Sequence, residues 1–284
     1  MVTPAELGSS LAKTVAGSKE LLEMIYKDLA QPGVQQAGAA VGTILGLGNT
    51  LVLPLRLLNE RASIAFLNNM ERYRESLKDV AMSDIRPVAS EVGIPILERL
   101  AYVTDEAIAE MFIQLLSSAS QTAHADEVHP AFVHVIDNMS PDEAKLLGAI
   151  SIYAYNIFGT YQIVPPGSQI VIANRKYLLS PVIMEKAQLT YPAYVAAYVE
   201  NLKRLGILES FFDSKPEQHL QDQVTAIQSA AAELIEQEPL RHLPGAVKWN
   251  FGLIVYSEFG RFFKWSIRKR LDADADADVS NVES

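Results

Sequence analysis

The sequence predicts a mainly α-helical protein with a smaller α/β module in its second half. Three observations support this fold class. Apolar residues recur at helical spacing through most of the first 160 positions. Runs typical of strands come later, at 207–212 and 247–256, and a Pro-Pro-Gly turn at 165–167 separates two short runs that suit a small hairpin. With 284 residues, 49% of them apolar and 20% charged, the chain can form one large domain or two small ones.

Four regions follow from this pattern. A helical N-terminal region takes residues 1–82, and a second helical segment takes residues 83–139. Residues 140–270 form the α/β module. The last region, 271–284, is an Asp-Ala repeat that predicts an acidic, solvated and disordered tail.

The N-terminal half is predicted to be helical. Helices are expected over 5–29, over 55–80 and from Thr104 onward. Thr104 suits an N-cap because acidic residues, which favour the positive end of a helix, follow it directly. Residues 88–102 contain a glycine and a proline, so we expect two short helices or one kinked helix there.

The α/β module begins at a strong helix start. Ser140, Pro141 and Glu143 form a capping box with proline at the first helical position, and this helix is predicted to run to about Phe158. The elements expected after it are hairpin strands at 161–164 and 169–172, a helix at 192–205, a strand at 207–212, an inserted helix at 217–236, a strand at 247–256 and a last helix through Arg270. A helix that ends at Gly206 directly before a strand is similar to winged-helix domains, where the wing follows the recognition helix.

An uncharged stretch from Leu29 to Leu55 carries Gly38, Gly42 and Gly46. On a helix these glycines stack on one face and allow another helix to approach closely. The stretch is also long enough to cross a bilayer, which takes about 20 apolar residues. Three interpretations stay open: a membrane-inserting helix, a tight helix pair inside a soluble protein, or an oligomer contact.

The net charge of −10 is unevenly distributed. An acidic chain is a poor candidate for binding nucleic acid, because phosphate contacts need clustered bases. The densest basic cluster precedes the tail, where Arg261, Lys264 and Arg268 share one face of the predicted last helix beside Trp265. This face suits contact with an anionic membrane surface. The favoured interpretation, however, is a docked terminal helix with a solvated basic edge.

The helix at 192–205 lacks the residues that read DNA. Its first turn is Tyr-Pro-Ala-Tyr-Val, whereas reading helices place Arg, Asn or Gln there. Its two bases, Lys203 and Arg204, lie near its end. We therefore expect the module to bind protein or to serve a structural role, with DNA binding as the minor alternative.

The sequence predicts no catalytic, metal or cofactor site. His124, His129 and His134 lie five residues apart, which does not stack them on a helix, and the favoured interpretation is that His129 caps the next helix. Asp142 and Glu143 resemble the acidic pair of a metal-dependent nuclease, but both lie in one helical turn and the capping box explains them. The chain has no cysteine, which excludes disulfides and thiolate chemistry.

Several sequence pieces follow one another in a specific order. They are residues 46–58, 93–102, 105–116, 128–133, 146–147 after the capping box, and 257–262. On these pieces, which cover most of residues 20–265, the chain resembles the abortive infection alpha (Abi-alpha) family of bacterial proteins. The resemblance implies a bacterial or prophage protein linked to abortive infection, a form of phage defence. It supplies no catalytic residues.

Together these patterns predict a non-enzymatic protein that acts in abortive infection through protein–protein or membrane association. The N-terminus lacks the basic flank and apolar core of a signal peptide, so we expect a cytoplasmic location, with the inner membrane as a second site. A protein partner or self-association is expected, and no cofactor or nucleic acid. The alternatives are a metal-dependent nuclease or other toxic enzyme of phage defence, and a DNA-binding winged-helix regulator.

Overall fold

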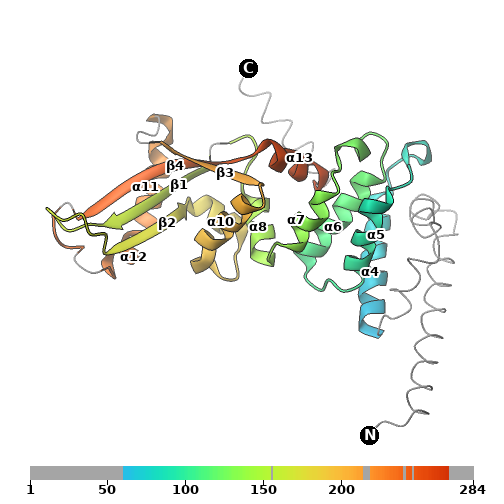
Figure 1. Cartoon of the computed structure of the whole chain (residues 1–284), viewed down its shortest axis with the longest axis horizontal. Helices are drawn as coiled ribbons and strands as arrows, with labels where there is room; N and C mark the ends of the chain where they lie inside the picture. Colours follow the sequence, from blue (N-terminus) through green and yellow to red (C-terminus); the bar gives the residue numbers. More distant parts are fainter. Residues whose placement is uncertain (1–59, 155, 214–217, 239–240, 245, 269–284) are drawn as a thin grey trace, which may run out of the picture. The chain divides into compact units, whose positions relative to one another are not determined.

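The computed structural model describes residues 60–154, 156–213, 218–238, 241–244 and 246–268. They form two compact units: unit 1 takes the described residues up to Asp137 and from Phe262 onward, and unit 2 takes residues 138–261. Unit 1 is helical, and unit 2 combines helices with one antiparallel sheet (Figure 1). The protein is therefore mixed α/β. Residues 1–59, with the predicted helix over 5–29 and the glycine-bearing Leu29–Leu55 stretch, lie outside the described residues.

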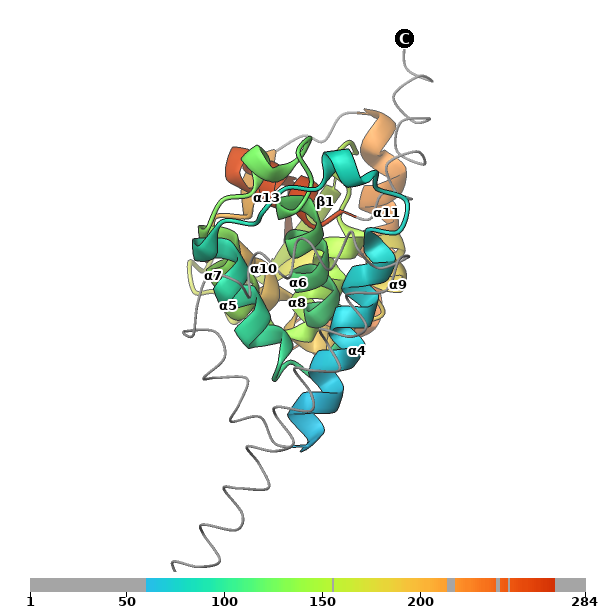
Figure 2. The ribbon, with the colours of Figure 1, turned by 90° about the vertical axis from the view of Figure 1, so that its right-hand side faces the viewer.

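Unit 1 packs its helices around α6, Glu106–Ala119 (Figure 2). Every residue from Met111 to Ala119 is buried, so α6 is surrounded by other elements and forms the centre of this unit. The other elements of unit 1 before Asp137 are α4 (Glu60–Ser76), α5 (Ser90–Leu100), α7 (Ala131–Asp137) and the 3-10 turns Met82–Asp84 and Ala125–Glu127.

Two predictions for unit 1 need correction. The N-cap of α6 is Asp105, not Thr104: its carboxylate accepts hydrogen bonds from the N–H groups of Ala107 at 3.0 Å and Ile108 at 3.1 Å. The alternative of two short helices over 88–102 is also wrong, because α5 continues through Pro95. Its apolar face is buried, and this packing outweighs the hydrogen bond that proline removes.

Unit 2 is built on a four-stranded antiparallel sheet with the strand order β2-β1-β4-β3. Its strands are β1 (Asn156–Ile163), β2 (Ala173–Leu179), β3 (Leu208–Asp213) and β4 (Val247–Tyr256). β4 has the predicted bounds, and β3 is shifted by one residue from the predicted 207–212. The β1–β2 hairpin is longer than the small hairpin expected, and it pairs with β4 along the whole of β1.

The predicted helix to Phe158 is wrong, because α8 (Pro141–Ala149) ends at Ala149 and Phe158 lies in β1. The side chain of Asn156 explains the early end. Its Oδ1 accepts a hydrogen bond from the Ser151 N–H at 3.1 Å, and its Nδ2 donates to the Ser151 carbonyl at 2.8 Å. These bonds satisfy backbone groups that a longer helix would otherwise pair.

Helices cover both faces of the sheet. Phe158 and Gly159 are neighbours on β1 and so point to opposite faces. The Phe158 ring contacts Tyr177, which binds Lys203 of α10 (Val195–Arg204), whereas Gly159 lies against Ile227 of α11 (Gln221–Ala230). Hence α10 and α11 lie on opposite faces. The remaining elements are α9 (Pro181–Ala187), α12 (Ala232–Glu236), and the 3-10 turns Pro192–Tyr194 and Gln218–Leu220.

The last helix, α13, spans Glu258–Ser266 and stops before the predicted Arg270. The division between the units falls inside it. Within unit 1, Phe263 meets Phe132 edge to face at 5.4 Å between ring centroids, and the Ser118 hydroxyl donates to the Ser266 carbonyl at 2.8 Å. In the described ranges, no helix combines the length and the apolar character that crossing a bilayer requires.

Candidate interaction surface at the start of α10

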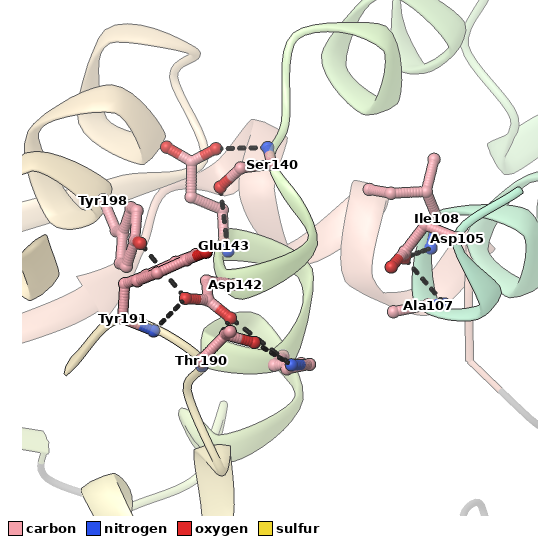
Figure 3. Close-up of polar contacts among 10 residues, drawn as sticks. Asp105, Ala107, Ile108, Ser140, Asp142, Glu143, Thr190, Tyr191 and Tyr198 are labelled. Carbon is pink, nitrogen blue, oxygen red and sulfur yellow. Dashed lines mark hydrogen bonds and ion pairs between the residues drawn. The ribbon is translucent and has the colours of Figure 1, made fainter. Parts of the chain in front are cut away.

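Asp142, in the first turn of α8, is a buried carboxylate with an exposed fraction of 4%. Its oxygens accept hydrogen bonds from the backbone N–H groups of Thr190 and Tyr191, each at 2.8 Å. The Tyr198 hydroxyl donates to it at 3.1 Å (Figure 3). Lys145 Nζ lies 3.3 Å away. One carboxylate therefore joins α8 to the segment before α10 and to α10 itself.

These contacts set the ionisation of the carboxylate. Burial raises the pKa of Asp142, but hydrogen bonds from the Thr190 and Tyr191 backbone and from the Tyr198 and Thr190 hydroxyls outweigh it and lower the pKa to about 2. Burial and the hydrogen bond to Asp142 raise the pKa of Tyr198 to about 12. At neutral pH, Asp142 is ionised and both of its oxygens accept hydrogen bonds. We call Asp142 with its partners Thr190, Tyr191 and Tyr198 the Asp142 clamp, because it holds these segments together.

Glu143 forms the capping box that the sequence predicts. The Ser140 N–H donates to Glu143 Oε2 at 2.5 Å, and the Glu143 N–H donates to Ser140 Oγ at 3.3 Å (Figure 3). The capping box does not explain Asp142, whose main partners sequence reasoning missed. Thr190 is 48 residues away along the chain, and no local pattern connects the two.

Two tyrosines at the start of α10 point into solvent. Tyr191 and Tyr194 have exposed fractions of 62% and 61%, and their rings lie 6.4 Å apart at an interplanar angle of 63°. Asp142 holds the backbone of Tyr191, so the ring projects from a fixed point. Exposed tyrosines on a rigid backbone offer a large contact area at a low entropic cost, which is why they are enriched at protein interfaces.

The end of α10 is internally bonded. Lys203 Nζ donates to the Tyr177 hydroxyl at 2.7 Å, and Arg204 donates to Asn201 Oδ1 at 2.7 and 3.1 Å. Gly206 follows the end of α10 as the predicted C′ residue: it has a φ of +75°, and the N–H of the following residue reaches back to the Leu202 carbonyl. Both bases of this helix therefore have partners within unit 2.

The three histidines considered in the sequence analysis have separate surroundings in unit 1. His129 accepts a hydrogen bond from the Ala131 N–H at 3.1 Å at the start of α7, which confirms the capping interpretation. His124 lies 3.7 Å from Glu127, and His134 is exposed on α7. Among the described residues, no three His, Asp or Glu side chains are grouped as a metal site requires.

The predicted basic face lies partly on α13. Arg261 is ion-paired with Glu258, one turn earlier, and Arg268 lies two residues beyond the end of the helix. Trp265 and Phe262 are both partly exposed and meet edge to face, with ring centroids 5.6 Å apart. Lys264, beside Trp265, is half-buried. Contact of this face with a membrane stays a prediction, as does the face formed by Gly38, Gly42 and Gly46.

Comparison of the chain with known proteins identifies its family. The family model described as abortive infection alpha matches residues 65–266. A solved structure, that of an uncharacterized protein from the hydrocarbon-degrading marine bacterium Alcanivorax borkumensis SK2, is 17% identical over 51% of this chain and 94% of that chain, with a TM-score of 0.29. Among curated proteins, no significant match is found. The family match takes in most of the chain, including α8, the sheet and α10, and the chain therefore belongs to the abortive infection alpha family.

Proposed function

We propose that this protein acts in abortive infection without catalysis, by binding a protein partner through Tyr191 and Tyr194. The observation that carries the proposal is the exposed tyrosine pair held on the Asp142 clamp. A surface that is already ordered before binding loses little conformational entropy when a partner arrives. In this proposal the protein is cytoplasmic and the partner is a protein of the phage or the host.

We further propose that unit 2 is a winged-helix-like module with two additions. The order α8, β1, α9, α10, β3, β4 and the sheet order β1-β4-β3 support this reading, with β2 and the α11–α12 segment as the additions. In such a module α10 would occupy the place of the reading helix. Its tyrosine-bearing start and its internally bonded Lys203 favour a protein partner over DNA. We expect at most weak, salt-sensitive DNA binding.

A non-catalytic role is supported by the state of the acidic residues. Asp142 and Glu143 are buried, and their carboxylates accept hydrogen bonds from backbone N–H groups of their own unit. These carboxylates are therefore engaged in structural contacts. The competing hypothesis is a toxic enzyme, such as a metal-dependent nuclease. That hypothesis requires side chains that activate a nucleophile or hold a metal.

Phage challenge of cells that carry the gene tests the proposal. The double variant Tyr191→Ala and Tyr194→Ala should lose protection while it keeps the wild-type unfolding curve, because both rings are exposed. Tyr102→Ala, at an equally exposed tyrosine of unit 1, is the matched control and should protect normally. If the double variant protects fully, or if His124→Ala with His129→Ala abolishes protection in a folded protein, the non-enzymatic, tyrosine-based proposal is wrong.

A second candidate function is association with the anionic inner membrane through α13. The observation that favours it is the partly exposed Phe262–Trp265 pair next to Lys264, since aromatic rings beside bases suit a lipid interface. Sedimentation with vesicles of phosphatidylglycerol should pull down the protein, and vesicles of phosphatidylcholine should not. Trp265→Ala with Lys264→Glu should abolish pelleting. Equal pelleting of wild type and variant would remove this candidate.

A further inference from the structure

The outer edge of β3 carries backbone groups that the described chain leaves unpaired. β3 pairs with β4 alone, residue by residue from Leu208 to Asp213 without a bulge. The Ser257 N–H donates to the Ile207 carbonyl at 3.1 Å, so Ile207 occupies a position that is hydrogen-bonded to the neighbouring strand. Such positions alternate along an antiparallel strand, and the backbone N–H and C=O groups of Ser210 and Phe212 therefore point away from β4. Within the described residues, no backbone group bonds to the N–H of either residue.

Two large apolar side chains lie on the same edge. Phe211 and Phe212 have exposed fractions of 55% and 66%, and as neighbours on a strand they project to opposite faces of the sheet. The Phe212 ring rests edge to face on Phe158 with ring centroids 5.3 Å apart, so its position is fixed although it is exposed. An arriving strand would meet an apolar contact on each face.

The charge of β3 selects the kind of strand that fits. The strand reads Leu-Glu-Ser-Phe-Phe-Asp, with two acids and no base. Glu209 is exposed and has no ion pair with any residue that the structure describes. A second copy of β3 would bring further acids to the same short edge, which is unfavourable in a cross-strand pair. A basic strand would offset the charge of Glu209.

We propose that the outer edge of β3 binds an extended, basic segment of a partner protein by strand addition. The segment's backbone pairs with the outward groups of Ser210 and Phe212, its Lys or Arg lies near Glu209, and its apolar residues contact the two phenylalanines. The inference rests on the proposed function only in taking partner binding as the mode of action. It names a surface separate from Tyr191 and Tyr194.

A random ten-residue peptide library displayed on phage, panned against the full chain, tests this inference. Enriched peptides should carry Lys or Arg next to aliphatic or aromatic residues. A synthetic copy of the most enriched peptide should slow amide hydrogen exchange in residues 208–213. Its affinity should fall at least tenfold in Phe212→Pro, which removes an outward N–H, and in Phe212→Lys, which repels a basic peptide. Val182→Lys, at an exposed apolar residue of α9, is the matched control and should bind normally.

Three outcomes would overturn the inference. Peptides that are acidic, or that protect another segment, would place the binding site elsewhere. A dimer in sedimentation velocity that Phe212→Lys dissociates would assign the edge to a second copy. No enrichment above background would show that the edge does not take such a strand. In each case, loss of phage protection by the Tyr191 and Tyr194 variants would still support the proposed function, so the two failures are distinguishable.

Discussion

The two edges of the sheet in unit 2 are built in opposite ways. On β2, the register with β1 shifts between Gly159 and Tyr161, and Tyr177 adopts a φ of +53°. A charged side chain, Arg175, also lies on that strand and ion-pairs with Glu238 at 3.2 Å. β3 has a regular register and two exposed phenylalanines instead. A bulge is one device by which proteins prevent further strand pairing, and of these two edge strands only β2 carries one.

The irregular β2 edge is held by its contacts. A positive φ is strained for a tyrosine and persists only where the surroundings fix it. The Tyr177 hydroxyl accepts a hydrogen bond from Lys203 at 2.7 Å and lies 3.4 Å from Ser210 Oγ, while its ring contacts Phe158 at 4.9 Å between centroids. The comparison thus teaches that unit 2 holds an irregular strand at one edge by side-chain contacts and has a regular strand at the other edge.

The largest expected effect comes from a change that removes the β3 edge altogether. A Cβ at Gly252 would lie 2.3 Å from the Phe211 carbonyl oxygen and 2.7 Å from Phe158 ring carbons, so Gly252→Val should lower the free energy of unfolding by more than about 3 kcal/mol. Urea unfolding measures the loss, and hydrogen exchange should show β3 opening before β2. Gly148→Ala, where a Cβ meets nothing within 4 Å, is the control and should not destabilise the protein.

The pH dependence of unfolding reports on the contacts between α8 and α10 rather than on the two edges of the sheet. The pKa of Asp142 is lowered from 3.8 to about 2, so its carboxylate contributes stability above the unfolded pKa and loses it as the pH falls from about 5 towards 2. That contribution is roughly 2 kcal/mol. Asp142→Asn should flatten the pH dependence of unfolding in this window. An unchanged slope would show that Asp142 is not the clamp.

Removal of one hydroxyl should loosen the irregular β2 edge. Tyr177→Phe deletes the acceptor of the Lys203 hydrogen bond, and we expect a loss of about 1–2 kcal/mol and faster amide exchange at the end of α10. Tyr153→Phe, at an exposed tyrosine, serves as the control and should leave stability unchanged. If Tyr177→Phe behaved like the control, the contacts of Tyr177 would not hold the β2 edge.

The smallest expected effect on stability is at the open edge itself. Glu209 is exposed and unpaired among described residues, so Glu209→Lys should change the free energy of unfolding by less than about 0.5 kcal/mol. It should nevertheless reverse the charge of the peptides selected in panning, from basic to acidic. Selection of basic peptides by this variant would show that Glu209 does not choose the partner strand.

The sequence predicted those helix ends and strands that depend on residues next to one another in the chain. The capping box fixed the start of α8, the glycine after Leu205 marked the end of α10, and alternating apolar residues gave the bounds of β4. The helix predicted to Phe158 failed because the signal that ends α8 is a set of side-chain hydrogen bonds from Asn156, with no proline or glycine to mark it.

The surfaces needed long-range information. The sequence showed Tyr-Pro-Ala-Tyr-Val at the start of a helix, but only the fold brings Asp142 to the Tyr191 backbone. Likewise, Phe211 and Phe212 look like core residues in a strand, and their exposure depends on β3 lying at the end of the strand order. Strand order is set by tertiary pairing, which one sequence does not reveal.

The junction where α13 begins has an evolutionary consequence. A Cβ at Gly260 would lie 2.0 Å from the Ile207 carbonyl oxygen, and Ser257, three residues earlier, donates to the carbonyl of Gly206. Glycine is thus the residue that this backbone approach accepts, whatever the surrounding surface becomes. An alignment of the family should therefore keep glycine at this column even among relatives whose exposed tyrosines and strand edges have diverged to follow different partners.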